Sequence, residues 1–330
     1  MEALKGVSEK LIPMVRSPLL MRTLLPGVAA TAVIYPCLRI DVVFSSEKIE
    51  NLYRPAIGIS LLILLLGLLL SFVSNDIYRI YEGRIFWPQK IFDALLHLQQ
   101  ARVKMLRNAA AKAEDEKPLK YREFWYLLRR YPTDENGDPC ASHPTLLGNI
   151  IAAYEGYPLS RYGMDGVFYW TRIWLQMERE KKDEIESVWC VADGLVTLSA
   201  VGYGGALFWL TIGIARALGL AIVLNVPYHP FLITTGLLTL GYLFYRLSLP
   251  CTRANGEVFK AVFDLYRNQL MVMAEIGPVE TERWRGVWSY LQYLLVHCAS
   301  CGKYYAAKGN QCPSCGFPKA RSLSQISRSR

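Results

Sequence analysis

The chain has 330 residues, of which 52% are hydrophobic, and it carries a formal net charge of +9. This apolar content, together with eight tryptophans, is high for a soluble globular protein and favours a membrane protein. The positive charge would suit nucleic acid or anionic lipid, but the long apolar runs favour the lipid bilayer, so nucleic acid is not an expected partner. Motifs of nucleotide binding, zinc proteolysis and serine hydrolysis are absent from the sequence, and we therefore expect no enzyme.

The first predicted element is an amphipathic N-terminal segment over residues 1–18. Its apolar positions share one helical face, and lysines occupy other positions, which is typical of a helix lying on a membrane surface. The apolar positions are Leu4, Val7, Leu11 and Val15.

A transmembrane hairpin follows over residues 19–74, with predicted spans at 23–38 and 55–74. The second span contains no charge over twenty positions, a length that crosses the hydrocarbon core of a bilayer. The first span is shorter, because Arg22 and Arg39 bound it. Ala29–Ala32 also allows a signal-peptide cleavage site, but the apolar run continues past it, which favours a span.

Residues 75–187 predict a helical cytoplasmic domain, in which basic and acidic side chains are equal in number. Apolar residues recur at a helical period within it. The expected helices cover 89–116, 120–131 and 144–154, and a long helix is expected to run from Gly166 through the charged block 178–186 into the next span.

Two stretches of this domain resemble segments of bacterial multi-pass membrane proteins of unassigned function. They are His143-Pro-Thr-Leu-Leu-Gly-Asn-Ile-Ile151 and Tyr157-Pro-Leu-Ser-Arg-Tyr-Gly-Met-Asp-Gly-Val167. The resemblance brings no activity or site residue with it and implies only a bacterial inner-membrane protein.

A second transmembrane hairpin is predicted over residues 188–250, with spans at 194–215 and 228–250. Val201-Gly-Tyr-Gly204 has the letters of a potassium-channel filter, but the surrounding sequence is unlike a pore loop. We expect Ser199, Gly202 and Gly205 (or Gly204) to allow close helix packing instead.

Asp193 begins the first of these two spans. An ionisable group in a membrane helix is a functional candidate, whereas a hydrated interfacial position is the alternative that its nearness to Glu186 favours.

The orientation of the spans follows from the basic residues near their ends. Fourteen Lys and Arg residues lie on one side and four on the other. The positive-inside rule therefore predicts a multi-pass inner-membrane protein with both termini in the cytoplasm.

An amphipathic helical stalk is predicted over residues 251–297. Asn255 can cap its first helix, and Gly277-Pro278 separates a second helix that is expected to run directly into Cys298.

Two Cys-x-x-Cys-Gly motifs then predict a zinc ribbon over residues 298–318, ahead of a disordered basic tail at 319–330. Each motif supplies two thiolates at a chelating spacing, so four ligands would close a structural Zn²⁺ site with no open position. The alternative is two chance pairs or a disulfide pair. The pattern resembles the short zinc-ribbon module found at the ends of many unrelated proteins. The expected ligands are Cys298, Cys301, Cys312 and Cys315.

The sequence thus predicts an all-α membrane protein: four transmembrane helices in two hairpins, a helical cytoplasmic domain and a C-terminal zinc ribbon. The expected function is a membrane-anchored assembly or recruitment protein whose ribbon docks a cytosolic protein partner, with the chain forming a homo-oligomer. The alternative is an oligomeric channel or pore-forming membrane effector lined by the third span. A transporter is the weaker third hypothesis.

Overall fold

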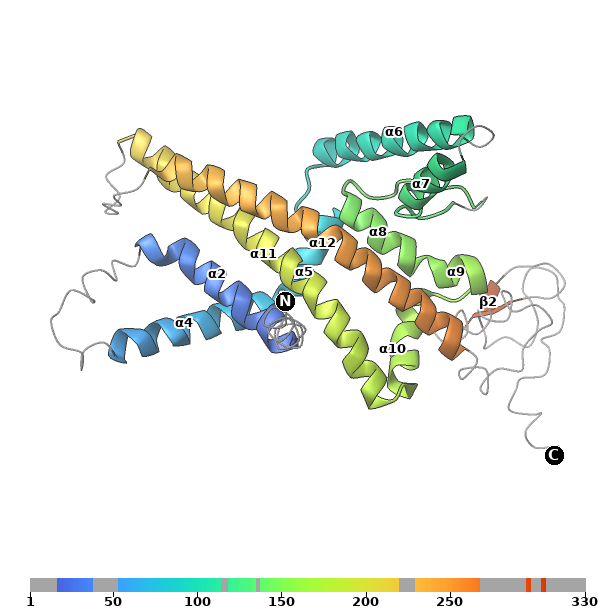
Figure 1. Cartoon of the computed structure of the whole chain (residues 1–330), viewed down its shortest axis with the longest axis horizontal. Helices are drawn as coiled ribbons and strands as arrows, with labels where there is room; N and C mark the ends of the chain where they lie inside the picture. The colour runs from blue at the N-terminus through green and yellow to red at the C-terminus, as the bar shows by residue number, and fades with distance from the viewer. Residues whose placement is uncertain are drawn as a thin grey trace, which may run out of the picture. The chain divides into compact units, whose positions relative to one another are not determined.

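Figure 1 shows a computed structural model of the chain, which describes residues 17–37, 53–113, 118–134, 137–219, 229–267, 295–297 and 304–306. These residues are mostly helical, as the sequence predicts. The helices are η1 (Leu20–Leu24), α2 (Leu25–Ile34), η2 (Tyr35–Cys37), α4 (Tyr53–Phe72), α5 (Ser74–Glu82), α6 (Gln89–Ala113), α7 (Pro118–Leu128), α8 (Leu146–Glu155), α9 (Tyr157–Tyr162), α10 (Gly166–Gln176), α11 (Arg179–Ala217) and α12 (Pro230–Tyr266).

The chain divides into two compact units, each described separately below. The first comprises Met1–Pro132, Pro139–Ala152 and Glu178–Val258, and the second comprises Thr133–Asp138, Ala153–Met177 and Phe259–Arg330. The two strands of the described residues, β1 (Leu295–His297) and β2 (Tyr304–Ala306), pair antiparallel with His297 opposite Tyr304.

Two of the described helices, α11 and α12, are long and apolar enough to cross a membrane. Helix α11 contains the predicted span 194–215, and α12 covers the predicted span 228–250 from Pro230 onward. Both helices support a membrane protein. A third crossing results if Ala56–Phe72 and Ser74–Glu82, which meet at a bend of 50°, form one broken span. The apolar helix over Leu20–Ile34, where the sequence predicts the first span, is shorter.

The helix that the sequence predicts from Gly166 into the third span is interrupted. Asp165 caps α10 by accepting a 2.7 Å hydrogen bond from the Phe168 backbone N–H. The backbone then becomes extended at Met177 and Glu178, where α10 ends and α11 begins. The second part of the prediction is confirmed, because α11 runs without a break from the charged block into the apolar span.

The predicted boundary after the fourth span is wrong. Asn255 does not cap a new helix, because α12 continues through Pro250 and Asn255 to Tyr266. A proline inside a helix removes one backbone hydrogen bond and usually kinks or ends it. Here the residues beyond Pro250 keep a buried face that includes Thr252, Asn255 and Phe259. Burial of that face overrides the local stop signal.

The helices predicted between the two hairpins agree with the structure to within a few residues. Helices α6, α7 and α8 lie where the sequence places three helices, and the predicted end of the first, 114–116, lies outside the described residues. Helices α6 and α7 pack against each other (Figure 1). Their buried residues include Val103, Leu106 and Ala110 of α6 and Leu128 of α7.

Glycines bring the apolar helices of the first unit into backbone contact. A Cβ atom on Gly67 of α4 would lie 2.3 Å from the Thr23 carbonyl oxygen, and one on Gly194 of α11 would lie 2.7 Å from that of Met21. A Cβ atom on Gly202 of α11 would lie 2.7 Å from the Cα atom of Gly241 in α12. The small residues of the third span therefore serve helix packing, as predicted, and the potassium-filter letters lie in a continuous helix.

We expect alanine at Gly202 to destabilise the protein by about 1–3 kcal/mol, because the added methyl group meets backbone that cannot move aside. Gly204, on the same helix, is the matched control, since nothing lies within 4 Å of a Cβ atom there. Thermal unfolding in detergent should show a lower midpoint for Gly202→Ala and no loss for Gly204→Ala. Equal midpoints for the two variants would contradict the packing.

Candidate functional site

The predicted zinc ligands Cys298, Cys301, Cys312 and Cys315 lie outside the described residues, as do the basic tail and most of the predicted stalk. Only the strands beside the first cysteine pair are described. Leu295–His297 is a strand, so the predicted helix does not continue to Cys298. Among the residues that the structure describes, no group of three or more His, Cys, Asp or Glu side chains is placed to hold a metal ion.

Asp193 forms a polar centre between three helices of the first unit. Its Oδ2 atom lies 2.6 Å from Arg22 Nη2 and accepts a 2.7 Å hydrogen bond from Arg22 Nε. Its Oδ1 atom accepts a 2.7 Å hydrogen bond from the Tyr78 hydroxyl. The Asp193 side chain is 23% exposed. The charge at the start of the third span is therefore matched by a cation and a hydroxyl, and its role is to join η1, α5 and α11.

A second polar group also joins α5 to α11. The Ser199 hydroxyl is 2.7 Å from the Tyr81 hydroxyl and donates a 2.8 Å hydrogen bond to the Gly241 carbonyl. The Tyr81 ring stacks on Tyr245 of α12, with the ring centroids 5.7 Å apart. These contacts tie α5, α11 and α12 together where Gly202 allows α11 and α12 to touch.

The stretch 143–151 has a structural role in this fold. The Asn149 side chain is fully buried, accepts hydrogen bonds from the backbone N–H groups of Ser142 and His143, and donates to the carbonyls of His143 and Thr145. Thr145 donates to the Tyr81 carbonyl and accepts from the Gly148 N–H. The stretch thereby fixes the start of α8 against the end of α5.

His143 lies beside this turn, close to the ion pair in which Arg84 Nε is 2.6 Å from Glu82 Oε2. Burial, and then the positive charge of Arg84, lowers the pKa of His143. Its Nδ1 atom is 2.8 Å from the Ser142 hydroxyl. The neutral ring thus packs as part of the turn at neutral pH.

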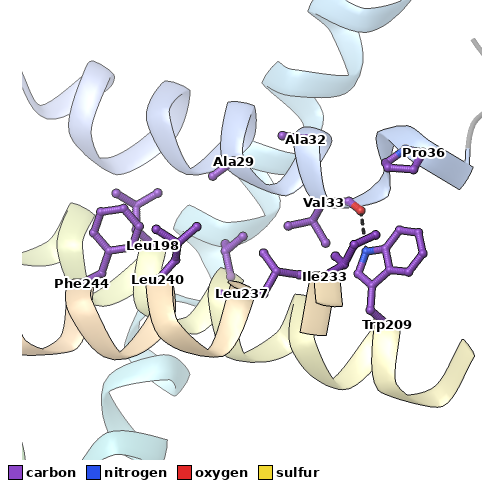
Figure 2. A pocket seen from close by; sticks show the side chains of 12 residues that line it. Ala29, Ala32, Val33, Pro36, Leu198, Trp209, Ile233, Leu237, Leu240 and Phe244 are labelled. Atoms are coloured by element: carbon purple, nitrogen blue, oxygen red, sulfur yellow. Dashed lines mark hydrogen bonds between the residues drawn. The ribbon is translucent and has the colours of Figure 1, made fainter. Parts of the chain in front are cut away.

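An apolar cavity of about 500 Å³ opens between α2, α11 and α12 (Figure 2). The Trp209 side chain lies at one end, where its Nε1–H donates a 3.0 Å hydrogen bond to the Val33 carbonyl. A lining of this kind suits an apolar group such as a lipid tail and offers no group for acid–base chemistry. The lining residues include Ala29, Pro36, Leu198, Ile233, Leu237 and Phe244.

Comparisons with known proteins gave no match to a family model, to a curated protein or to a solved structure. The function must therefore be argued from the residues of this chain. Sequence reasoning identified Asp193 but missed Arg22 and Tyr78 as its partners, since they are 171 and 115 residues away. Asn149 was also missed. The only signal for it is a polar residue among the apolar neighbours of α8.

Replacing Asp193 with asparagine should lower stability by about 1–2 kcal/mol, because Arg22 loses its anionic partner in a partly buried place. Asp76→Asn is the matched control: it breaks the ion pair with Arg79, in which both side chains are more than half exposed, and should change stability by less than about 0.5 kcal/mol. Thermal unfolding in the same detergent measures both. A loss for Asp76→Asn as large as that for Asp193→Asn would count against the centre.

Proposed function

We propose that the chain is a four-span inner-membrane protein, with both termini in the cytoplasm, that anchors a zinc ribbon for docking a cytosolic protein partner. Helices α11 and α12 support the second hairpin. For the first hairpin, the support is the continuous helical run from Leu20 to Cys37, at roughly 1.5 Å per residue about 27 Å long, and its contact with α4 through Thr23 and Gly67. Most of the charged residues lie in the segments between and after these hairpins, which the proposed topology assigns to the cytoplasm.

The observation that carries the zinc ribbon is the pairing of β1 with β2. Six sequence positions, 298–303, connect the two strands, and they contain Cys298 and Cys301. A Cys-x-x-Cys pair in the short connection of an antiparallel hairpin has both thiolates held near one point, as a tetrahedral zinc site needs. The second pair, Cys312 and Cys315, follows within reach of the same point along the chain.

The ribbon acts as a contact platform and not as a catalyst. Four thiolate ligands leave no open coordination position for water or substrate. Binding zinc in such peptides contributes roughly 10–16 kcal/mol, which is enough to fold a short segment that lacks an apolar core. The expected homo-oligomer is a second part of this proposal, and the exposed apolar faces of the spans are where lipid or another subunit would pack.

The alternative of an oligomeric channel lined by the third span remains a hypothesis. The small-residue face of that span packs within the protomer, because Gly202 meets Gly241 and Gly205 meets Val33.

The purified full-length chain should hold zinc in a ratio of one ion per chain, measured by plasma mass spectrometry after dialysis. Cys301→Ser and Cys312→Ser should each lose most of it, because three thiolates bind zinc far more weakly than four. Cys140→Ser is the matched control, since Cys140 lies outside the predicted ribbon and its replacement should leave the zinc content unchanged. Zinc-free wild-type protein, or full retention in both variants, would overturn the ribbon.

Deletion of 298–330 tests the docking role separately. The deletion variant should insert into the membrane as the wild type does, because the spans precede the deletion. In the full-length chain, a cross-linker placed at position 304 should react with a cytosolic protein. This cross-link should disappear in the Cys312→Ser variant, which has lost its zinc. The measurement is cross-linking in cells followed by mass spectrometry of the adduct. The same adduct in wild type and in the zinc-free variant would argue against a zinc-dependent platform.

A further inference from the structure

Two arginines of the first unit face one tyrosine ring, and a third lies close to one of them. Arg253 of α12 places its guanidinium carbon 3.4 Å from the centroid of the Tyr126 ring, and Arg130, just beyond α7, places its own 5.9 Å from the same centroid. Arg102 of α6 is close enough for its charge to act on Arg130 and on Tyr131. Segments far apart in the sequence thus bring three positive charges together.

The two inner guanidinium groups have hydrogen-bonding capacity that the protein leaves unused. Arg130 Nε and Arg253 Nη1 are buried and find no acceptor among the described residues. Stacking on an aromatic face satisfies the flat side of a guanidinium and leaves its edge N–H groups free. A buried N–H without an acceptor is costly, so these edges favour an added acceptor.

The charges are also unbalanced. Burial lowers the pKa of Arg130 most, and the positive charge of Arg253 lowers it further. The charge of Arg102 adds a smaller decrease, while Tyr126 and Tyr131 act in the opposite direction. Arginine stays protonated in proteins, so the repulsion is not relieved by loss of a proton. An anion bound between the three groups would relieve it.

We propose that Arg130 and Arg253, which share the Tyr126 ring, form a binding site for a phosphate group together with the nearby Arg102. Guanidinium edges match the paired oxygens of phosphate, and two or three arginines are the usual means of binding it. Arg253 stands three residues beyond Pro250 on a helix long and apolar enough to span a membrane. The phosphate group therefore has two candidate sources: the headgroup of an anionic lipid and a soluble phosphate compound.

The test uses the full-length protein in lipid nanodiscs with two arms. In the first arm the lipid is phosphatidylcholine alone, and pyrophosphate is titrated in. In the second arm no soluble phosphate is present, and phosphatidylglycerol replaces part of the neutral lipid. The readouts are the midpoint of thermal unfolding and, in the first arm, the dissociation constant from calorimetry.

A higher midpoint in the first arm alone assigns the site to a soluble phosphate compound, and in the second arm alone to a lipid headgroup. A rise in both arms supports the shared phosphate chemistry. Arg130→Gln and Arg253→Gln should each weaken pyrophosphate binding, or the lipid effect, by roughly tenfold or more. Arg122→Gln, at an exposed arginine of α7, is the matched control and should keep the wild-type response.

Two outcomes would overturn the site: no response of the wild-type protein in either arm, or a full response in the Arg130→Gln and Arg253→Gln variants. Without ligand these variants should unfold at the wild-type midpoint or above it, because each removes a repelling charge. That measurement shows whether the two variants are folded. If they are not, the titrations of the wild-type protein alone test the site.

Discussion

Backbone contact at a few glycines is the constraint on which the apolar part of this protein depends. Hydrocarbon offers no hydrophobic force between helices, so their association needs close approach and polar contacts. Gly67 and Gly202 supply that approach, each at a distance that any side chain would block. The polar contacts follow from it, because Ser199 reaches the Gly241 carbonyl only where the two helices already touch. The Asp193–Arg22 pair then adds a charged contact at the same end of the third span.

Long unbroken helices connect this packed region to the charged parts of the chain. Helix α11 contains both the charged block and the third span, and α12 continues past Pro250 to Tyr266. Because a helix is stiff, the position of its apolar half fixes the position of its polar half. Arg253 therefore stands at a defined depth relative to the span, next to Tyr126, and the proposed phosphate site depends on that placement.

Local patterns predicted the apolar runs, helices α6 to α8 and the small-residue face of α11, because each is encoded by neighbouring residues. Long-range pairs were not accessible to such reasoning: Arg22 meets Asp193 across 171 positions, and Arg253 meets Tyr126 with similarly little local signal. The predicted helix start at Asn255 was wrong because tertiary burial outweighed a capping preference worth about 1 kcal/mol. The strand at Leu295–His297 was missed because it depends on pairing with β2 on the far side of the first cysteine pair, and a search for helical periodicity does not detect such a pairing.

The membrane topology is the central claim, since the proposed zinc ribbon and the depth of the proposed phosphate site both depend on it. It is tested most directly by labelling with a membrane-impermeant maleimide in intact cells, in a background in which all eight native cysteines are replaced by serine. Single cysteines introduced by Ser45→Cys and Asn225→Cys should be labelled before permeabilisation, and Ser160→Cys only after it. Labelling of position 160 in intact cells, or protection of positions 45 and 225, would contradict four spans with both termini in the cytoplasm.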